Sequence, residues 1–270
     1  MTLGRRDFCI GAAAGGLVLG AGAARAAEAA DYLQLVFNDP YKPEQNTEYE
    51  RWYSEQHIPD MFNVPGMQTI TRTMVLRGAT PTSTLAKHLT LYTITTDQIE
   101  YALGEPPRRQ ARGLNPSTPT MDASTTRSIV FRALGPWMKP GPGAAPAKAD
   151  PKGGPLQTYF MVVLVNPLAP SEAAPDASYD EAHVREVMGA AGMTGARLYT
   201  LYRPLTKNYA APTAMALWRF ESGDIDATMA DMAARRTAGG VKPLPRWAPD
   251  HVQVYYAREL YQRDHDHPKG

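Results

Sequence analysis

Apolar runs and helical spacings follow one another in a regular order along the first half of the chain. Tyr32–Phe37 is an apolar, β-rich run that ends at an Asn-Asp-Pro turn sequence. Residues 47–57 then place Tyr49, Tyr53 and His57 four apart, on one face of a helix. The other elements predicted here are strands at Met67–Leu76, His88–Thr95 and Arg127–Leu134 and a helix at 97–112, weakened by Pro106 and Pro107. The order is strand, helix, strand, strand, helix, strand.

The first predicted helix has a start signal and a stop signal. Thr47 and Glu50 fit a capping box, with Thr47 as the N-cap residue and Glu50 reaching back to it. Pro59 disfavours helical geometry at the preceding residue, so we expect the helix to break just after His57. The helix dipole would then favour the protonated form of this histidine.

A weaker copy of the same pattern recurs in the second half at a constant offset. His183 follows His57 by 126 residues (183 − 57 = 126). The same offset relates Tyr53 to Tyr179, Gly66 to Gly192, Met67 to Met193, and Tyr92 to Trp218. The predicted elements are strands at Tyr159–Val165, Arg197–Tyr202, Ala214–Phe220 and Val252–Leu260, a helix with Tyr179 and His183, and a helix at Ile225–Arg236. The chain is therefore interpreted as a tandem duplication.

Each half has the β-α-β-β-α-β order of a ferredoxin-like unit, so the predicted fold class is α+β. The sheet of such a unit has helices on one face, and its other face must be covered. We expect the two sheets to pack as an intramolecular α+β barrel with a cleft inside each half. The predicted boundaries are 31–134 for the first unit, 135–155 for a linker rich in Pro, Gly and Ala, 156–261 for the second unit, and 262–270 for a disordered tail.

Composition narrows the classes of partner. The chain has 270 residues, 43% of them hydrophobic and 20% charged, with a net charge of +1. This balance is typical of a globular protein, and it lacks the basic excess that nucleic acids or anionic membranes attract. We expect neither a nucleic-acid partner nor a membrane association after processing of the N-terminus.

Residues 1–26 resemble a twin-arginine export signal. Arg5 and Arg6 precede a Gly- and Ala-rich apolar run, and Ala24-Arg25-Ala26 fits a cleavage site. The sequence thus predicts recognition by the twin-arginine export machinery and a periplasmic or secreted location. Cys9 is the only cysteine and lies in this signal, so the mature chain would have no disulfide or thiolate.

The run from Trp52 to Pro59, WYSEQHIP, followed by Val-Pro-Gly-Met at 64–67, resembles the EthD-like family of the dimeric α+β barrel superfamily. The resemblance covers about 100 residues of the first half and reaches the second half through the internal repeat. It implies a barrel that binds small apolar or aromatic molecules. The second copy departs from the motif at Ser178, Val184-Arg185 and Ala191, so the first site is expected to be the working one. A homodimer of such chains is compatible with this arrangement.

His57 is the leading catalytic candidate because imidazole exchanges protons near neutrality. Tyr53 could stack on an aromatic substrate or donate its hydroxyl to a developing oxyanion. The alternative is that His57 bonds a backbone carbonyl at the helix end and Tyr53 packs in the core. The other substrate-binding candidates are Trp52, which lies on another helix face, His88 and Tyr92, which share a strand face, and Tyr179, His183 and Trp218.

The predicted function is an exported, cofactor-independent enzyme, a lyase or isomerase with His57-centred acid/base chemistry on a small apolar or aromatic compound. A cofactor-free monooxygenase comes next. No His, Asp or Glu cluster has metal-ligand spacing, and no metal is expected. Two alternatives remain open: a non-catalytic periplasmic binding protein, and an oxidoreductase that binds haem.

Overall fold

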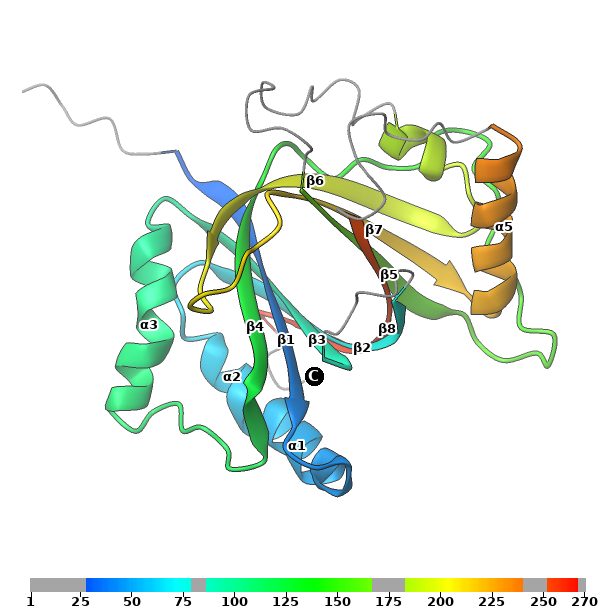
Figure 1. The fold of residues 1–270 in the computed structure, drawn as a ribbon. Helices are drawn as coiled ribbons and strands as arrows, with labels where there is room; N and C mark the ends of the chain where they lie inside the picture. The colour runs from blue at the N-terminus through cyan, green and yellow to red at the C-terminus, as the bar shows by residue number, and fades with distance from the viewer. Residues whose placement is uncertain (1–27, 79–85, 167–182, 240–251, 267–270) are drawn as a thin grey trace, which may run out of the picture.

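The computed structural model describes residues 28–78, 86–166, 183–239 and 252–266 (Figure 1). The first half contains β1 (Ala30–Pro40), α1 (Asn46–Trp52), the π-helix η2 (Tyr53–His57), α2 (Ile58–Met61), β2 (Met67–Gly78), β3 (His88–Thr96), α3 (Ile99–Ala111) and β4 (Met121–Ala133). The second half contains β5 (Gln157–Val165), β6 (Met193–Pro204), β7 (Ala214–Ser222), α5 (Ile225–Thr237) and β8 (Val252–Asp264). A 3-10 turn at Pro43–Gln45 precedes α1.

The eight strands close into one barrel in the order β1-β3-β2-β8-β5-β7-β6-β4. The first half supplies β4-β1-β3-β2 and the second supplies β8-β5-β7-β6, so corresponding strands occupy corresponding places. The halves are joined by antiparallel pairing of β2 with β8 and of β4 with β6. Closure removes the free edges that two open sheets would present. The halves therefore pair edge to edge around a common interior.

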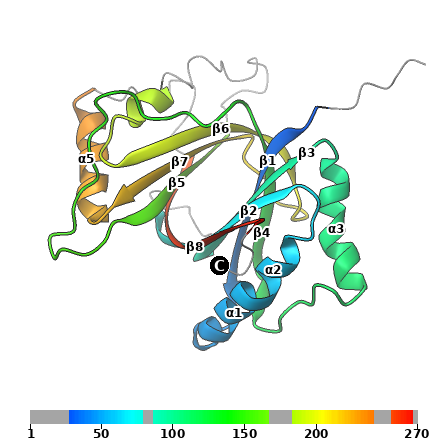
Figure 2. The ribbon, with the colours of Figure 1, turned by 180° about the vertical axis from the view of Figure 1, so that it is seen from behind.

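Strand alternation divides the apolar residues between the interior and the helix-covered outer faces. Leu33, Leu35 and Phe37 of β1 point into the barrel and pack with residues of both halves, such as Leu89 and Phe160. The intervening positions face outward. Helices α1, α2 and α3 cover the outer face of the first half, and α5 covers that of the second (Figures 1 and 2).

Gly66 and Gly192 occupy equivalent turns before β2 and β6. Both have positive φ, +83° and +75°, and a Cβ at either position would meet a backbone oxygen, that of Thr95 or Glu221. The two oxygens are also 126 residues apart (221 − 95 = 126). The same glycine carbonyls accept hydrogen bonds from Thr95 and Glu221 N–H at 2.8 and 2.9 Å. Only glycine fits both the backbone conformation and the space.

We expect Gly66→Ala and Gly192→Ala each to lower the free energy of unfolding by about 1–3 kcal/mol, because a left-handed backbone and a steric overlap are combined. Gly113→Ala is the matched control: its φ is +72°, but a Cβ at this position would have no neighbouring atom within 4 Å. Urea denaturation should rank Gly113→Ala as the mildest of the three. Equal costs at all three positions would contradict the steric argument.

Three sequence expectations need correction. The first helix begins at Asn46, and its N-cap residue, Gln45, makes no side-chain cap bond, so Thr47 is not the N-cap. The chain stays helical beyond His57 to Met61. Strand β8 continues to Asp264, past the predicted boundary at 261, because its end pairs with the start of β2. The export signal at 1–26 lies outside the described residues. In the part of the chain that is described, no helix is long and apolar enough to cross a membrane.

Candidate functional site

A π-helical turn positions His57. Pro59 has no N–H, and its ring would clash with the carbonyl four residues earlier in a regular helix. The chain instead widens over Tyr53–His57, with the Ile58 N–H donating to the Tyr53 carbonyl. Widened turns of this kind are frequent at functional sites. The break expected at Pro59 is thus replaced by a local change of helical pitch.

The same turn brings two aromatic rings against the imidazole. The Trp52 ring stacks on His57 with centroids 4.6 Å apart, and the Tyr53 ring meets it edge-on at 5.0 Å. Trp52 is five residues before His57, which in an α-helix would place it on another face, as the sequence suggested. The π-turn instead brings the rings of both Trp52 and Tyr53 into contact with His57.

His57 and its partners lie outside the barrel, between the first half-sheet and the helices. Tyr53 and Tyr92 belong to the cluster under α1, α2 and α3, whereas Leu89 and Leu91 belong to the interior cluster. Ile94 also faces the helices because the alternation of β3 is regular. His57 and Tyr92 therefore lie on the helix-covered face of the sheet and not on its interior face, where apolar side chains from both sheets meet.

Both ring nitrogens of His57 are hydrogen-bonded. Nδ1 lies 3.3 Å from Oδ1 of Asn115, and Nε2 lies 3.1 Å from the hydroxyl of Tyr92. An amide oxygen only accepts, so Nδ1 carries the proton in this arrangement. Nε2 is then the basic nitrogen and accepts from Tyr92. The structure thus assigns His57 a fixed tautomer with its proton acceptor directed at the sheet.

The imidazole is held neutral. Burial lowers the pKa of His57 to about 4; the Asn115 hydrogen bond opposes this shift, and the positive charge of Arg72 adds to it. Burial also raises the pKa of Tyr92 well above its ordinary value, with Tyr53 contributing in the same direction. The expected protonation of His57 by the helix dipole does not occur, because the helix continues to Met61 and desolvation dominates.

This shift makes stability depend on pH. Between about pH 4 and the pKa of about 6.5 in an unfolded chain, the unfolded state binds the additional proton. The free energy of unfolding should therefore fall by up to about 3 kcal/mol as pH drops through this range. Urea denaturation at pH 7 and pH 4.5 measures this change. The free energy of unfolding should decrease less in His57→Gln than in the wild-type protein. Identical decreases in the two proteins would contradict the assigned pKa.

A buried ion pair lies beneath the aromatic residues. Arg72 on β2 has no exposed surface. Its Nη2 donates to Glu50 Oε1 at 2.6 Å, and its Nε lies 3.3 Å from Glu50 Oε2. The guanidinium also lies 3.9 Å from the centroid of the Tyr53 ring. Burial opposes the charge, but Tyr53 and Glu50 raise the pKa of Arg72 above its usual range, so it stays charged.

The network extends from Arg72 to both ends of the site. Arg72 Nη1 donates to Thr90 Oγ1 at 2.8 Å and to Asn38 Oδ1 at 3.3 Å, and Asn38 donates in turn to the Tyr53 hydroxyl. At the other end lies His88, 3.3 Å from Asp39 and 3.4 Å from Glu50. His88 is therefore placed with the carboxylates, and its described contacts do not reach His57.

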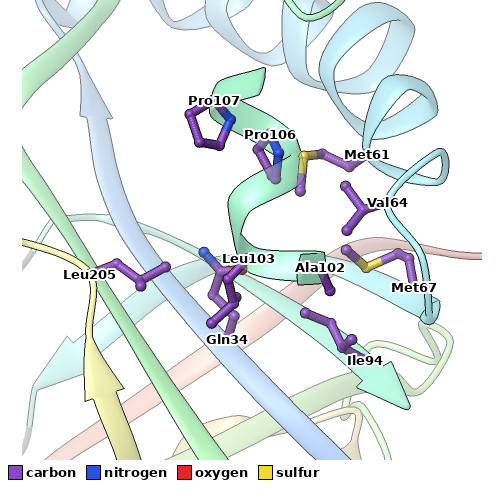
Figure 3. Close-up of a pocket in the computed structure, with 10 residues that line it drawn as sticks. All are labelled: Gln34, Met61, Val64, Met67, Ile94, Ala102, Leu103, Pro106, Pro107 and Leu205. Atoms are coloured by element: carbon purple, nitrogen blue, oxygen red, sulfur yellow. The ribbon is translucent and has the colours of Figure 1, made fainter. Parts of the chain in front are cut away.

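An apolar cavity of about 310 Å³ adjoins this network (Figure 3). Met61 lines it, and its sulfur lies 3.9 Å from Asn115 Nδ2, so the cavity is one side chain away from the partner of His57. Gln34 lines it too, and this residue pairs with Tyr92 across β1 and β3. The other lining residues are Val64, Met67, Ile94, Ala102, Leu103, Pro106, Pro107 and Leu205. Leu205, which follows β6, comes from the second half of the chain.

The two second-half candidates that the structure describes, Trp218 and His183, are not placed beside His57. Trp218 lies in the apolar cluster beneath α5, and its buried indole Nε1 has no hydrogen-bond partner among the described residues. His183 begins the described helical residues 183–187, whose Val184 packs in the same cluster. Tyr179 lies outside the described residues. The two halves therefore do not combine their histidines in one site.

Comparison with solved structures identifies the architecture. A proposed monooxygenase from Fusobacterium nucleatum aligns with a TM-score of 0.53 at 10% identity, over 87% of this chain and 94% of the other. The chain has the dimeric α+β barrel fold. An anthrone oxidase-like protein aligns at 0.49 (13% identity; 88% and 94% covered), and a chlorite dismutase variant from Candidatus Nitrospira defluvii at 0.43 (10%; 86% and 92%). No protein-family model and no curated protein match the sequence.

The residues around the cavity do not fit haem. An axial ligand is usually an imidazole, thiolate or phenolate, or a thioether paired with an imidazole. The described cavity lining offers the thioethers of Met61 and Met67 and none of the other three. Both nitrogens of His57 are already hydrogen-bonded. Across the described ranges, no group of three His, Cys, Asp or Glu side chains could hold a metal ion.

Several residues of the site were missed by the sequence analysis. Arg72, Asn38 and Asn115 had no assigned role, and Glu50 was assigned only to capping. Arg72 could have been noticed, because it lies on the same side of its strand as the apolar Ile70. Asn115 follows α3 in a loop, and nothing in the sequence near it points to His57.

Proposed function

We propose that this protein is an enzyme in which neutral His57 is the general base for proton abstraction from a small, largely apolar compound bound beside α3. The observation that carries this proposal is the fixed tautomer: Asn115 holds Nδ1–H, and Nε2 is left as the acceptor facing Tyr92. A base must be neutral and correctly oriented before the substrate arrives. His57 meets both conditions.

Tyr92 carries the proton between substrate and imidazole in this mechanism. Its raised pKa keeps the hydroxyl protonated, so it acts as a relay rather than a phenolate. The hydroxyl proton moves to His57 Nε2 while the Tyr92 oxygen takes the proton of the substrate. Asn115 Oδ1 then stabilises the imidazolium through its bond to Nδ1–H. The Trp52 ring stacked on the imidazole supports the cation further.

The low basicity of His57 restricts the substrate. A base with a pKa of about 4 takes protons efficiently only from relatively acidic groups. An example is a C–H bond whose carbon is attached both to a carbonyl and to an aromatic ring. Return of the proton to a different carbon gives an isomerase, and expulsion of a leaving group gives a lyase. Each outcome follows from the same first step and uses this chain's own residues without a cofactor.

A cofactor-free monooxygenase is the second candidate, and the named structural relative favours it. In that reaction the carbanion formed by proton abstraction would transfer electrons to molecular oxygen. The proton-abstraction step is shared, so the role of His57 does not change. Oxygen consumption separates the two candidates.

Hydrogen–deuterium exchange tests the shared step directly. 6-Hydroxy-2-tetralone and 5-hydroxy-2-indanone are small bicyclic ketones with acidic carbon–hydrogen bonds and a hydroxyl group. Proton NMR in D2O should show faster loss of these hydrogens with protein than in buffer, and an oxygen electrode should report whether O2 is consumed. Binding of both ketones without faster exchange would contradict the proposal and favour the non-catalytic binding protein.

We also infer that the chain arose by tandem duplication of an EthD-like unit. Corresponding strand orders, the paired glycine turns and matching registers support this: Met67 pairs with Ile94 as Met193 pairs with Phe220, each pair 126 residues from its counterpart. The WYSEQHIP motif coincides with the π-turn that positions His57. The first half then supplies the working site, and the second closes the barrel.

Export through the twin-arginine machinery, to the periplasm or outside the cell, remains part of this proposal. Its support is the N-terminal sequence pattern alone. Such machinery transports folded proteins, and a closed barrel whose two halves share an interior suits that route.

A further inference from the structure

The cavity beside α3 offers hydrogen-bond acceptors to a ligand and almost no donors. Gln34 is the single side chain in its described lining with a hydrogen-bonding group. Its Nε2 donates one of its two N–H groups to Ser128 Oγ at 2.9 Å, which fixes the orientation of the amide. The amide oxygen Oε1 is left as the acceptor.

Helix α3 has two carbonyls next to the cavity that lack their usual helical donors. Pro106 and Pro107 have no N–H, so the carbonyls of Ala102 and Leu103 lose the helical donors that would normally bond them. All four residues line the cavity (Figure 3). A ligand that carries an O–H or N–H group would satisfy these acceptors, whereas a purely apolar ligand would leave them without partners.

Gln34 also connects the cavity to the proton relay. It is the direct cross-strand partner of Tyr92, so the two side chains project from neighbouring positions on the same outer face. Tyr92 in turn bonds His57 Nε2. A ligand anchored on Gln34 would therefore have its polar end beside the relay and its apolar body against Met61, Met67 and Leu205.

We propose that Gln34 is the ligand-orienting residue of this cavity and that its ligand class is a small, apolar ring compound with a hydroxyl or N–H donor at one end. The catalytic role of this orientation rests on the proposed function. The binding of such a ligand at Gln34 does not depend on it. The cavity volume is at the lower end of the range for ligand pockets, which suits one or two rings.

2-Naphthol and 2-methoxynaphthalene are the matched probes, because they share a ring system and only the first has a donor. Fluorescence titration should give about tenfold tighter binding of 2-naphthol to the wild-type protein. Gln34→Met preserves side-chain length and removes the acceptor, so the preference should fall to about onefold. Gln110→Leu, an exposed change on α3, should retain it.

Methyl-labelled methionine locates the bound probe. Of the 12 methionines, Met61 and Met67 line the cavity, whereas Met232 lies on α5. Addition of 2-naphthol should shift the NMR signals of Met61 and Met67 and leave Met232 unchanged. This measurement uses the wild-type protein and does not depend on how well any variant folds.

The outcomes separate this inference from the proposed function. Equal affinity for the two probes, or a preference that survives in Gln34→Met, would overturn the role of Gln34 even if His57 proves catalytic. Shifts confined to Met232 would overturn the location. His57→Gln should keep the tenfold preference for 2-naphthol, since the imidazole is not the acceptor. If His57→Gln lost this preference and Gln34→Met kept it, the inference would also be overturned.

Discussion

His57→Gln is expected to slow the proton exchange of 6-hydroxy-2-tetralone by about 10²–10⁴-fold, the usual contribution of a positioned general base. Glutamine preserves the polarity and approximate reach of the side chain but cannot take up a proton. The Tyr92 hydroxyl would then have no base to receive its proton, and the relay would stop. The exchange rate measured by proton NMR is the test.

His265→Gln is the matched control for this change. His265 is largely exposed just after β8 and has no place in the relay, so its variant should exchange 6-hydroxy-2-tetralone at the wild-type rate. Asn115→Leu should fall between the two, because it leaves the imidazole present but free to change tautomer. A wild-type rate in His57→Gln would remove the proposed mechanism.

The second large effect concerns stability rather than rate. Arg72→Met is expected to lower the free energy of unfolding by about 3–5 kcal/mol, because it leaves Glu50 without its partner in a largely buried position. It also removes the donors that Thr90 and Asn38 accept from and the cation over the Tyr53 ring. Urea denaturation measures the change.

Two further variants make this prediction specific. Arg51→Met replaces an exposed arginine of α1 and should change stability by no more than about 0.5 kcal/mol. Combining Glu50→Leu with Arg72→Met removes both charges and should recover part of the loss, since a paired deletion leaves no uncompensated charge. If the double variant were less stable than Arg72→Met, charge compensation would not be the cause.

Periodicity was sufficient to predict most elements of the fold. The predicted strand at Ala214–Phe220 corresponds to β7, Ala214–Ser222, and the predicted helix at Ile225–Arg236 corresponds to α5, Ile225–Thr237. These elements have strong, uninterrupted patterns. The helix through His57 was harder, because a proline that usually ends a helix can be accommodated by a widened turn, and local pattern does not distinguish the two responses.

The sequence alone predicted a β-α-β-β-α-β order in both halves, placed His57 and Tyr53 in one helical region, and indicated His57 as the residue to examine. These properties depend on spacing along the chain. The tertiary structure decided which face of the sheet His57 meets, that its pKa is lowered, and that Arg72, Asn115, Tyr92 and Gln34 surround one site. Gln34, Arg72, Tyr92 and Asn115 converge there from β1, β2, β3 and the loop after α3. Desolvation and hydrogen bonding depend on that convergence in space, which strand register and barrel closure create and which no local sequence pattern encodes.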